Sequence, residues 1–418
     1  MKKNLWTLAA MLFMSVAFFS CGGDDEAGTG GGNDNTGEGG GSTTIPSGDV
    51  TPDKEKQYLE EVGREFVNLF KASDYQDIAD LGNELGNIEG EGVFEDFIKE
   101  TQNGAYDKTL LISMANIKGT YSGSYAEGKM KKVSSNGDLN ITYTASDKSQ
   151  WVLQATGSGS WGATTVSKDK DYHWDGNSSY YSTTTYKLDI PKSLNIKLTK
   201  NGASIANVNL NITNLTLDNE NVVDLGSKMS YTLTAQVKDF DVKSNAEYNA
   251  GGNASVSASV NKGGKALVAV SVNGSTTMSK GEITNGKANV NVVILNKVNI
   301  KGEMKDAKSF GEALEKADSY STDAANFDRW IKNANSYIDF GLYNNTPTKQ
   351  ATLFLGKDSY RKYDYSTGKD VTHYRPAAML KFADDTTYSL EEYFDEKSFQ
   401  SVTDAFNRVM GEFERLVK

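Results

Sequence analysis

The sequence predicts an α+β fold that is mostly β, in which amphipathic helices cover a large, curved antiparallel sheet built from repeated hairpin units. Two observations lead to this expectation. From about residue 110 to residue 301, apolar side chains alternate with Ser, Thr, Asn or Lys, as in strands with one buried face. In the N-terminal, middle and C-terminal parts of the body, apolar residues recur at three- and four-residue steps, as in amphipathic helices. Such helices need an apolar surface, and the buried face of the sheet provides it.

The body begins with a helix that we expect over 52–71. Thr51 can cap its N-terminus, and Pro52 suits the first helical position. Residues 74–105 are rich in Gly and acids, so we interpret them as a loop with short helical turns. We expect the helix, this loop and the following β region to form the first part of the body, 51–305.

The β region contains an internal duplication. Residues 200–202 (Lys-Asn-Gly) and 262–264 (Lys-Gly-Gly) are typical of tight hairpin turns. The apolar positions on either side of the two turns match one another. We therefore expect a duplicated unit over roughly 194–301, with a weaker third copy over 139–156.

Each full copy also departs once from strict alternation. Two apolar residues stand three positions apart at 237–240, and again at 295–298. A β-bulge inserts one extra residue into a strand and produces such a step. We therefore expect a bulge at each of these places.

The rest of the body, 306–418, is expected to pack on the same sheet. A helical period covers about 307–338, and three or four short strands rich in Tyr and Phe follow within 337–383. The chain ends in a helix expected over 397–418, with an apolar stripe of Phe399, Val402, Phe406, Val409, Met410, Phe413 and Leu416. We interpret the Phe and Met residues of these stripes as core.

The composition limits the classes of function. The 418 residues include 55 Asp and Glu against 44 Lys and Arg, a formal net charge of −11. This balance argues against a nucleic-acid partner, because phosphate binding needs clustered Lys and Arg. One Cys and two His in the whole chain argue against a disulfide framework and against Cys- or His-rich metal centres. We expect no metal and no cofactor.

The N-terminus has the pattern of an export signal. Two Lys precede the apolar run 5–19, which is too short for an ordinary membrane span. The segment 16–26, which contains Ser20 and Cys21, resembles the lipobox of bacterial lipoproteins, more narrowly that of outer-membrane lipoproteins of the Bacteroidota. The two Phe before Ser20 depart from the commoner Leu-Ala-Gly pattern. The resemblance covers this stretch alone, and implies a signal peptide over 1–20 and acyl chains on Cys21 that anchor the protein in the membrane.

An acidic cluster follows the cysteine. Asp24, Asp25 and Glu26 resemble the signal that, in the same phylum, sends lipoproteins to the outer face of the outer membrane. The resemblance therefore implies display at the cell exterior, and an ordinary acidic tether is the alternative. Residues 21–50 are rich in Gly and Asp and poor in large apolar residues, so we expect a disordered tether.

A cluster of aromatic and polar residues lies within 169–181. Rings beside carboxylates are typical of carbohydrate-binding surfaces, since sugar C–H faces stack on rings while polar groups bind hydroxyls. The candidate ligand-binding residues are Tyr172, Trp174, Asp175, Tyr180 and Tyr181. The alternative is that the rings form cross-strand pairs that stabilise a hairpin. The alternating acids do not form a calcium loop, because Trp174 stands where the pattern needs Gly.

No catalytic constellation is recognisable, and we expect a protein that is not an enzyme. Residues 123–129 have the spacing of a phosphate loop, but Met130 follows where a hydroxyl is needed. A catalytic triad would need His173 or His373 as its base, and neither lies near a nucleophile motif. The triplet that contains Thr386 (Asp-Thr-Thr) resembles the O-glycosylation acceptor of the same phylum, which makes Thr386 a candidate attachment site.

These observations favour a non-enzymatic, lipid-anchored cell-surface lipoprotein that binds an extracellular glycan or protein. One alternative is a periplasm-facing carrier of lipid or another apolar ligand in a cavity of the curved sheet. That layout is similar in outline to the periplasmic Lol-type lipoprotein carriers, without support from motifs. A fimbrial subunit is a third, less favoured alternative, because the chain ends in an expected helix and has no obvious terminal strand to donate.

Overall fold

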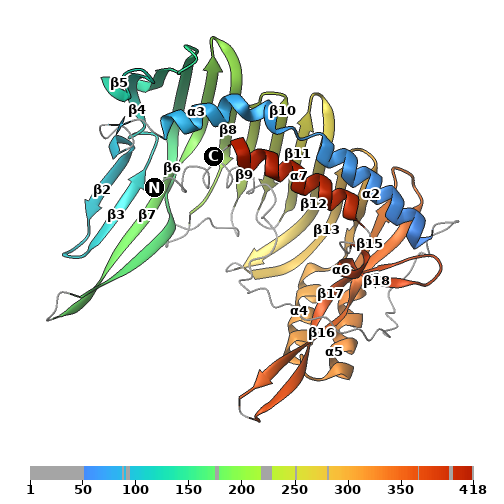
Figure 1. Ribbon diagram of the computed structural model, residues 1–418. Coiled ribbons are helices and arrows are strands. Elements are labelled where there is room, and N and C mark those ends of the chain that lie inside the picture. The colour runs from blue at the N-terminus through green and yellow to red at the C-terminus, as the bar shows by residue number, and fades with distance from the viewer. Residues whose placement is uncertain are drawn as a thin grey trace. The chain divides into compact units, whose positions relative to one another are not determined.

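The computed structural model is mostly β, with antiparallel strands joined by hairpins and helices in the N-terminal, middle and C-terminal parts of the chain (Figure 1). This confirms the predicted fold class. The structure describes residues 51–86, 89–90, 95–174, 178–217, 228–249, 252–279, 282–365, 367–394 and 399–416. The expected signal peptide and tether, with Cys21, Asp24, Asp25 and Glu26, lie outside the described residues, as does Asp175.

The chain divides into two compact units. The β1–β10 unit holds the described residues of 72–250 and 259–264, with the end of the last helix. The β12–β18 unit holds those of 1–71, 251–258 and 265–413. Strand β11 (Asn253–Lys262) is divided between the two.

The β1–β10 unit is built around a run of antiparallel hairpins. Its elements are η1 (Ala72–Tyr75), α3 (Gln76–Leu85), β1 (Glu89–Gly90), η2 (Glu95–Phe97), β2 (Ile98–Gln102), β3 (Asp107–Ile112), β4 (Lys118–Ser124), β5 (Lys129–Thr144), β6 (Gln150–Trp174), β7 (Ser179–Lys200), β8 (Ala203–Asn214), β9 (Met229–Val237) and β10 (Phe240–Tyr248). Strands β5 to β10 pair antiparallel in sequence order. Strand β3 pairs antiparallel with β2 and parallel with β7.

The expected loop at 74–105 is wrong in part, because it contains the ten-residue helix α3 and strand β2. Ile78, Leu81 and Leu85 recur at helical spacing and pack on the core of this unit, so burial of this stripe holds the helix despite the glycines around it. The core includes the fully buried rings of Tyr121 and Tyr143.

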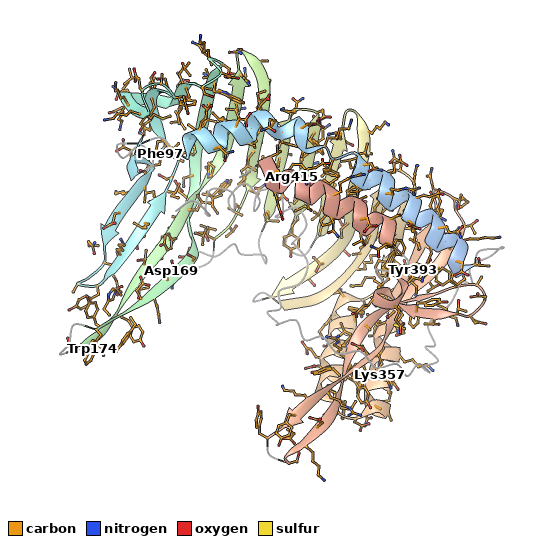
Figure 2. All side chains as sticks on the ribbon, viewed as in Figure 1. Phe97, Asp169, Trp174, Lys357, Tyr393 and Arg415 are labelled. Atoms are coloured by element: carbon orange, nitrogen blue, oxygen red, sulfur yellow. The ribbon has the colours of Figure 1, made fainter. Side chains whose placement is uncertain are left out.

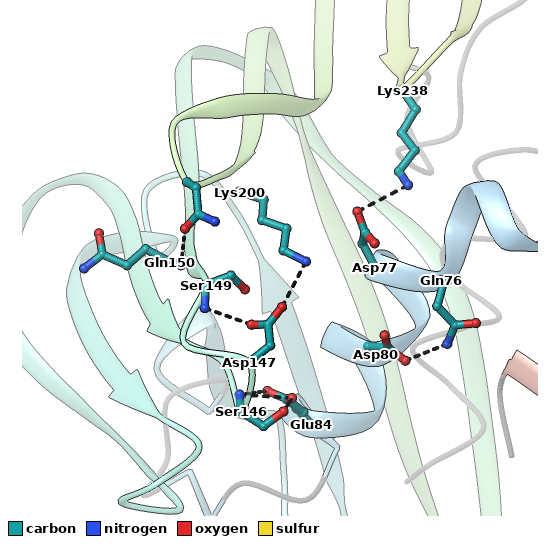
Figure 3. A network of polar contacts seen from close by, with 11 residues as sticks. Gln76, Asp77, Asp80, Glu84, Ser146, Asp147, Ser149, Gln150, Lys200 and Lys238 are labelled. Atoms are coloured by element: carbon teal, nitrogen blue, oxygen red, sulfur yellow. Dashed lines mark hydrogen bonds and ion pairs between the residues drawn. The ribbon is translucent and has the colours of Figure 1, made fainter.

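Polar contacts fix α3 to the β5–β6 turn (Figure 3). Glu84, near the end of α3, accepts hydrogen bonds from the Tyr143 hydroxyl (3.2 Å) and from the backbone N–H and hydroxyl of Ser146. In the same turn, Asp147 forms an ion pair of 3.3 Å with Lys200 of β7. The helix is thereby attached to the sheet by directed contacts as well as by apolar packing.

The β12–β18 unit is an antiparallel meander with helices. Its elements are α2 (Pro52–Asn68), β12 (Lys265–Ser279), β13 (Glu282–Ile294), β14 (Val298–Met304), α4 (Ala307–Ser319), α5 (Ala324–Asn335), β15 (Ile338–Tyr343), β16 (Lys349–Asp364), β17 (Lys369–Lys381), β18 (Thr387–Ser389), α6 (Leu390–Tyr393) and α7 (Gln400–Leu416), the last belonging to this unit as far as Phe413. Strands β12 to β18 pair antiparallel in sequence order.

Helix α2 begins as predicted, with Pro52 as its first residue and the Thr51 hydroxyl accepting the Lys54 N–H at 3.4 Å. The single helical period expected over 307–338 is two helices, since Asp323 caps α5 by accepting the Asn326 N–H at 3.1 Å. The strands expected to be short within 337–383 include β16, of 16 residues, and β17, of 13.

The C-terminal stripe is only partly core. Ala405 and Val409 of α7 are buried against Val67 of α2. Phe406 and Met410 are each one position further along the helix, which turns them about 100° away from that contact. Both are exposed, so their interpretation as core residues is wrong.

Each copy of the duplicated unit has four strands. The first copy is β7–β10 and the second is β11–β14. Both predicted turns are confirmed: the φ angles of Asn201 and Gly202 are 50° and 81°, and those of Gly263 and Gly264 are 55° and 78°. The predicted bulges are wrong, because 237–240 and 294–298 are hairpin turns, with Val237 paired to Phe240 and Ile294 to Val298. Lys238 and Leu295 adopt positive φ there without a glycine to signal the turn.

None of the described helices combines the length and the apolar composition that crossing a membrane requires.

Candidate binding surface on the β6–β7 hairpin

Strands β6 and β7, of 25 and 22 residues, form a long two-stranded hairpin (Figure 1). Strand β3 accompanies β7 only from Thr183 to Leu188. Between Thr183 and the tip, the described pairings of β7 are with β6 alone. The end of the hairpin is therefore a narrow ribbon with two faces.

The strand register assigns each ring to one face. Tyr172 lies directly opposite Tyr181, and Trp174 lies opposite Ser179. Because cross-strand partners share a face and neighbours along a strand alternate, Tyr172, Trp174 and Tyr181 lie on the same side. We call this side the aromatic face. Its three side chains are 58%, 65% and 64% exposed, and Figure 2 shows Trp174 at the end of the hairpin.

The opposite face carries a second set of rings, which stack on one another. His173 lies opposite Tyr180, with ring centroids 4.8 Å apart and planes inclined by 18°. Tyr106, next to β3, stacks on Tyr180 with centroids 4.0 Å apart. The His173 Nε2 atom lies 2.7 Å from the Ser182 hydroxyl oxygen. This stack stabilises the tip from one side and leaves the aromatic face to solvent.

The structure therefore separates residues that the sequence analysis grouped together. Tyr172, Trp174 and Tyr181 form one surface, where Tyr172 and Tyr181 also meet edge to face with centroids 5.3 Å apart. Tyr180 belongs to the stack on the other face, in agreement with the alternative that some rings stabilise the hairpin. Tyr180 and Tyr181 are neighbours in one strand, so strict alternation already implied opposite faces.

Sequence reasoning missed a second aromatic hairpin, formed by β16 and β17. Tyr360 lies opposite His373, with centroids 5.5 Å apart and planes inclined by 25°. Tyr363 and Tyr365 meet edge to face near the tip, and both are exposed. The sequence did contain a signal for this hairpin, namely three Tyr within 360–365 together with His373.

Some of the charges on this second hairpin are paired, whereas Arg361 and Lys362 lie opposite Thr372 and Val371. The Arg375 Nε donates to the Asp358 carboxylate at 2.7 Å, and Asp364 lies directly opposite Lys369. Tyr360 and Tyr363 are three residues apart on β16 and therefore point to opposite faces. The aromatic face of β6–β7, with three exposed rings on one side, is the better-defined candidate surface.

The other motifs of the sequence analysis lie in turns and between strands. Residues 123–129 connect strands β4 and β5, so no helix N-terminus follows them to hold a phosphate. Within the described ranges, no group of three His, Cys, Asp or Glu side chains is arranged to hold a metal ion. Thr386 lies in a turn, where its N–H donates to the Asp384 carboxylate at 3.0 Å and its hydroxyl donates to the same oxygen.

Comparison of the chain with protein-family models, with curated proteins and with solved structures found no match. The choice of the aromatic face therefore rests on its geometry.

Proposed function

We propose that this protein is a non-enzymatic, lipid-anchored lipoprotein of the outer membrane that faces the cell exterior and binds an extracellular glycan through the aromatic face. One observation carries the binding proposal. Tyr172, Trp174 and Tyr181 share one side of the tip and are each more than half exposed, although the rings on the other side satisfy each other by stacking.

The chemistry of this surface suits a sugar polymer. Exposed rings present flat apolar area that a sugar C–H face can cover, and a Tyr hydroxyl or Trp N–H can bind sugar hydroxyls at the same time. Neighbouring large apolar side chains exposed together are typical of interaction sites. The surface is an open ribbon, whereas a site for a small molecule usually encloses most of its ligand. An extended chain that lies along the ribbon fits this shape better.

The proposed location rests on the N-terminal sequence. The resemblance of 16–26 to a lipobox supports an acyl anchor at Cys21, and more than one acyl chain is needed for stable attachment. Treatment of intact cells with protease tests the orientation, because a Gly-rich segment such as 21–50 is readily cut where it is accessible. We expect release of the body from intact cells. Release only after lysis would contradict display at the exterior.

The carrier alternative is not favoured by the packing beneath α2. Leu59 and Val62 of this helix are buried directly against Leu342 and Leu380 of the sheet. Side chains thus fill the space under α2 that a ligand cavity would require.

The test of binding is affinity electrophoresis of the purified mature protein through gels that contain soluble polysaccharides. We expect retardation by at least one polysaccharide, and at least a tenfold loss of affinity in Trp174→Ala and in Tyr181→Ala, because an exposed large apolar side chain contributes roughly 1.5–3 kcal/mol when it becomes buried. Tyr125→Ala is the matched control, since Tyr125 is a 55% exposed ring in the β4–β5 turn of the same unit. Equal binding by all three folded variants would contradict the proposal.

A further inference from the structure

The strand leading to the aromatic face separates its charges by side. The charged side chains of β6 alternate in sign over Lys168, Asp169, Lys170 and Asp171. Their formal charges add up to zero, so the composition suggests a neutral segment. Alternate residues of a strand point to opposite faces, however, so both Lys share the side of Trp174 and both Asp lie on the other side.

Contacts on the opposite face agree with this assignment. Asp171 lies opposite Ser182, whose hydroxyl contacts His173. Tyr186 lies opposite Ser167 on the same side. Burial, a hydrogen bond with Asp169 and the charges of Asp169 and Asp171 together raise the pKa of the Tyr186 hydroxyl. The carboxylates of Asp169 and Asp171 therefore lie on the face that carries the ring stack.

The two lysines have no such partners. Both are exposed, and the ion pairs found among the described residues do not include them. Lys170 lies opposite Thr183, and Lys168 lies opposite Thr185. Asp107 of β3 is paired with Thr183, and its carboxylate accepts the Thr183 N–H at 2.9 Å.

The aromatic face therefore continues from its rings into a row of two ammonium groups and two hydroxyls, with the Asp107 carboxylate on the same side next to Thr183. Two positive charges against one leave this side positive. The spacing is about 7 Å from one lysine to the next and from Lys170 to Tyr172, which is two residues of strand. Figure 2 labels Asp169 and Trp174 on this hairpin. Lys168 and Lys170 are the two residues of β6 on either side of Asp169.

We propose that the glycan bound by the aromatic face is anionic, with its sugar rings on Tyr172, Trp174 and Tyr181 and its acidic groups at Lys168 and Lys170. This inference rests on the proposed function and specifies its ligand class. A chain with a net charge of −11 repels polyanions over most of its surface, so local positive charge is needed to select one. The lysine ammonium is a compact point charge that donates hydrogen bonds to carboxylate or sulfate without a geometric preference.

The test compares polygalacturonate with its highly methyl-esterified form, which keeps the sugar backbone and loses most of the charge. We expect the unesterified polymer to bind at least tenfold more tightly, with an affinity that falls as NaCl is raised. The double variant K168Q/K170Q should lose at least tenfold in affinity for polygalacturonate. Dextran sulfate and dextran form a second pair that separates sulfate from carboxylate as the recognised group.

The double variant D169N/D171N is the matched control, because it changes the same number of charges on the opposite face of the same segment. We expect less than a twofold change in its affinity. Equal and opposite effects of the two double variants would show that overall charge controls binding, and would overturn the inference. Binding of polyglutamate that depends on the lysines and not on Trp174 would overturn it as well.

The remaining outcomes separate this inference from the proposed function. If neutral and acidic polysaccharides bind equally, and Trp174→Ala weakens both while K168Q/K170Q weakens neither, the anionic specificity is wrong and the glycan-binding face stands. If no polysaccharide of either kind is retained by the folded protein, the proposed function itself is wrong.

Discussion

Asn335 pairs with the backbone of Leu355 as a neighbouring strand would. Its side-chain amide donates to the Leu355 carbonyl at 2.7 Å, and its carbonyl oxygen accepts the Leu355 N–H at 2.8 Å. Strand β15 pairs with β16 only as far as Leu353, so Leu355 lies just beyond the end of its neighbour. The last residue of α5 thus satisfies the backbone where the β16–β17 hairpin extends past β15.

This pairing predicts a large difference between two substitutions. Asn335 is only 5% exposed. The variant Asn335→Asp replaces the donor by a charged acceptor and leaves the Leu355 carbonyl unpaired, so we expect a loss of about 3 kcal/mol or more in the free energy of unfolding. Asn335→Ala should cost less, about 1–3 kcal/mol. Urea unfolding measures both, and an Asp variant as stable as the Ala variant would contradict the role of the two bonds.

Glu55 predicts a pH-dependent stability. This α2 carboxylate is 2% exposed, accepts one hydrogen bond of 2.6 Å from Asn344, and has no partner for its second oxygen among the described residues. Burial raises its pKa above the ordinary 4.5. The carboxyl is neutral in both states at low pH, and it ionises first in the unfolded state as the pH rises. Stability is therefore lost from about pH 4.5 up to the folded-state pKa, and stays at the lower value above it.

The variant Glu55→Gln keeps the Asn344 hydrogen bond and cannot ionise. We expect it to match the wild type near pH 4 and to exceed it by about 1–3 kcal/mol at pH 7, the usual penalty for a poorly satisfied buried group. The exposed Glu61 of the same helix supplies the control, since Glu61→Gln keeps Glu55 and should lose stability with rising pH as the wild type does. Unfolding in urea at a series of pH values gives both curves, and parallel curves for wild type and Glu55→Gln would sink the explanation.

Two glycines of the β12–β18 unit should respond in opposite directions to alanine. A Cβ on Gly302 of β14 would lie 2.1 Å from the Asp339 carbonyl oxygen and 2.6 Å from the Phe340 Cα. Since both are backbone atoms, Gly302→Ala must separate β14 from β15, and we expect a cost of about 1–3 kcal/mol. Gly311 of α4 has no atom within 4 Å of that position, so Gly311→Ala should stabilise the helix by about 0.5–1 kcal/mol. Thermal unfolding of the two variants distinguishes the signs.

The sequence was informative where a short local pattern determines the structure. Alternation and helical spacing identified the fold class, and Gly-containing turns at 200–202 and 262–264 were recognised correctly. The turn at Lys238 was missed because a residue other than glycine adopts positive φ there, so the segment lacks the glycine that signals such a turn. The contact of Asn335 with Leu355 joins different elements and has no signature in either segment.

For the candidate site, the sequence identified the rings and grouped them without assigning each one to a face of the hairpin. Alternation places Tyr172 with Trp174, but which of Tyr180 and Tyr181 joins them depends on the register across the hairpin. That register is set by the length of the connecting turn. Alternation along the strand also places Lys170 and Asp171 on opposite faces. A count of charges along the segment therefore did not reveal a positive side.

The two faces of the tip predict different effects of removing a ring. Tyr180 lies between His173 and Tyr106, and two stacked contacts of about 0.5–1.5 kcal/mol each hold the end of the hairpin. We expect Tyr180→Ala to raise amide hydrogen exchange at 171–174 and 179–182 roughly tenfold, since a factor of ten corresponds to about 1.4 kcal/mol. Tyr180→Phe keeps the ring and should exchange like the wild type. Trp174→Ala should leave exchange unchanged while it weakens glycan binding at least tenfold, and increased exchange in that variant would instead make Trp174 a structural residue.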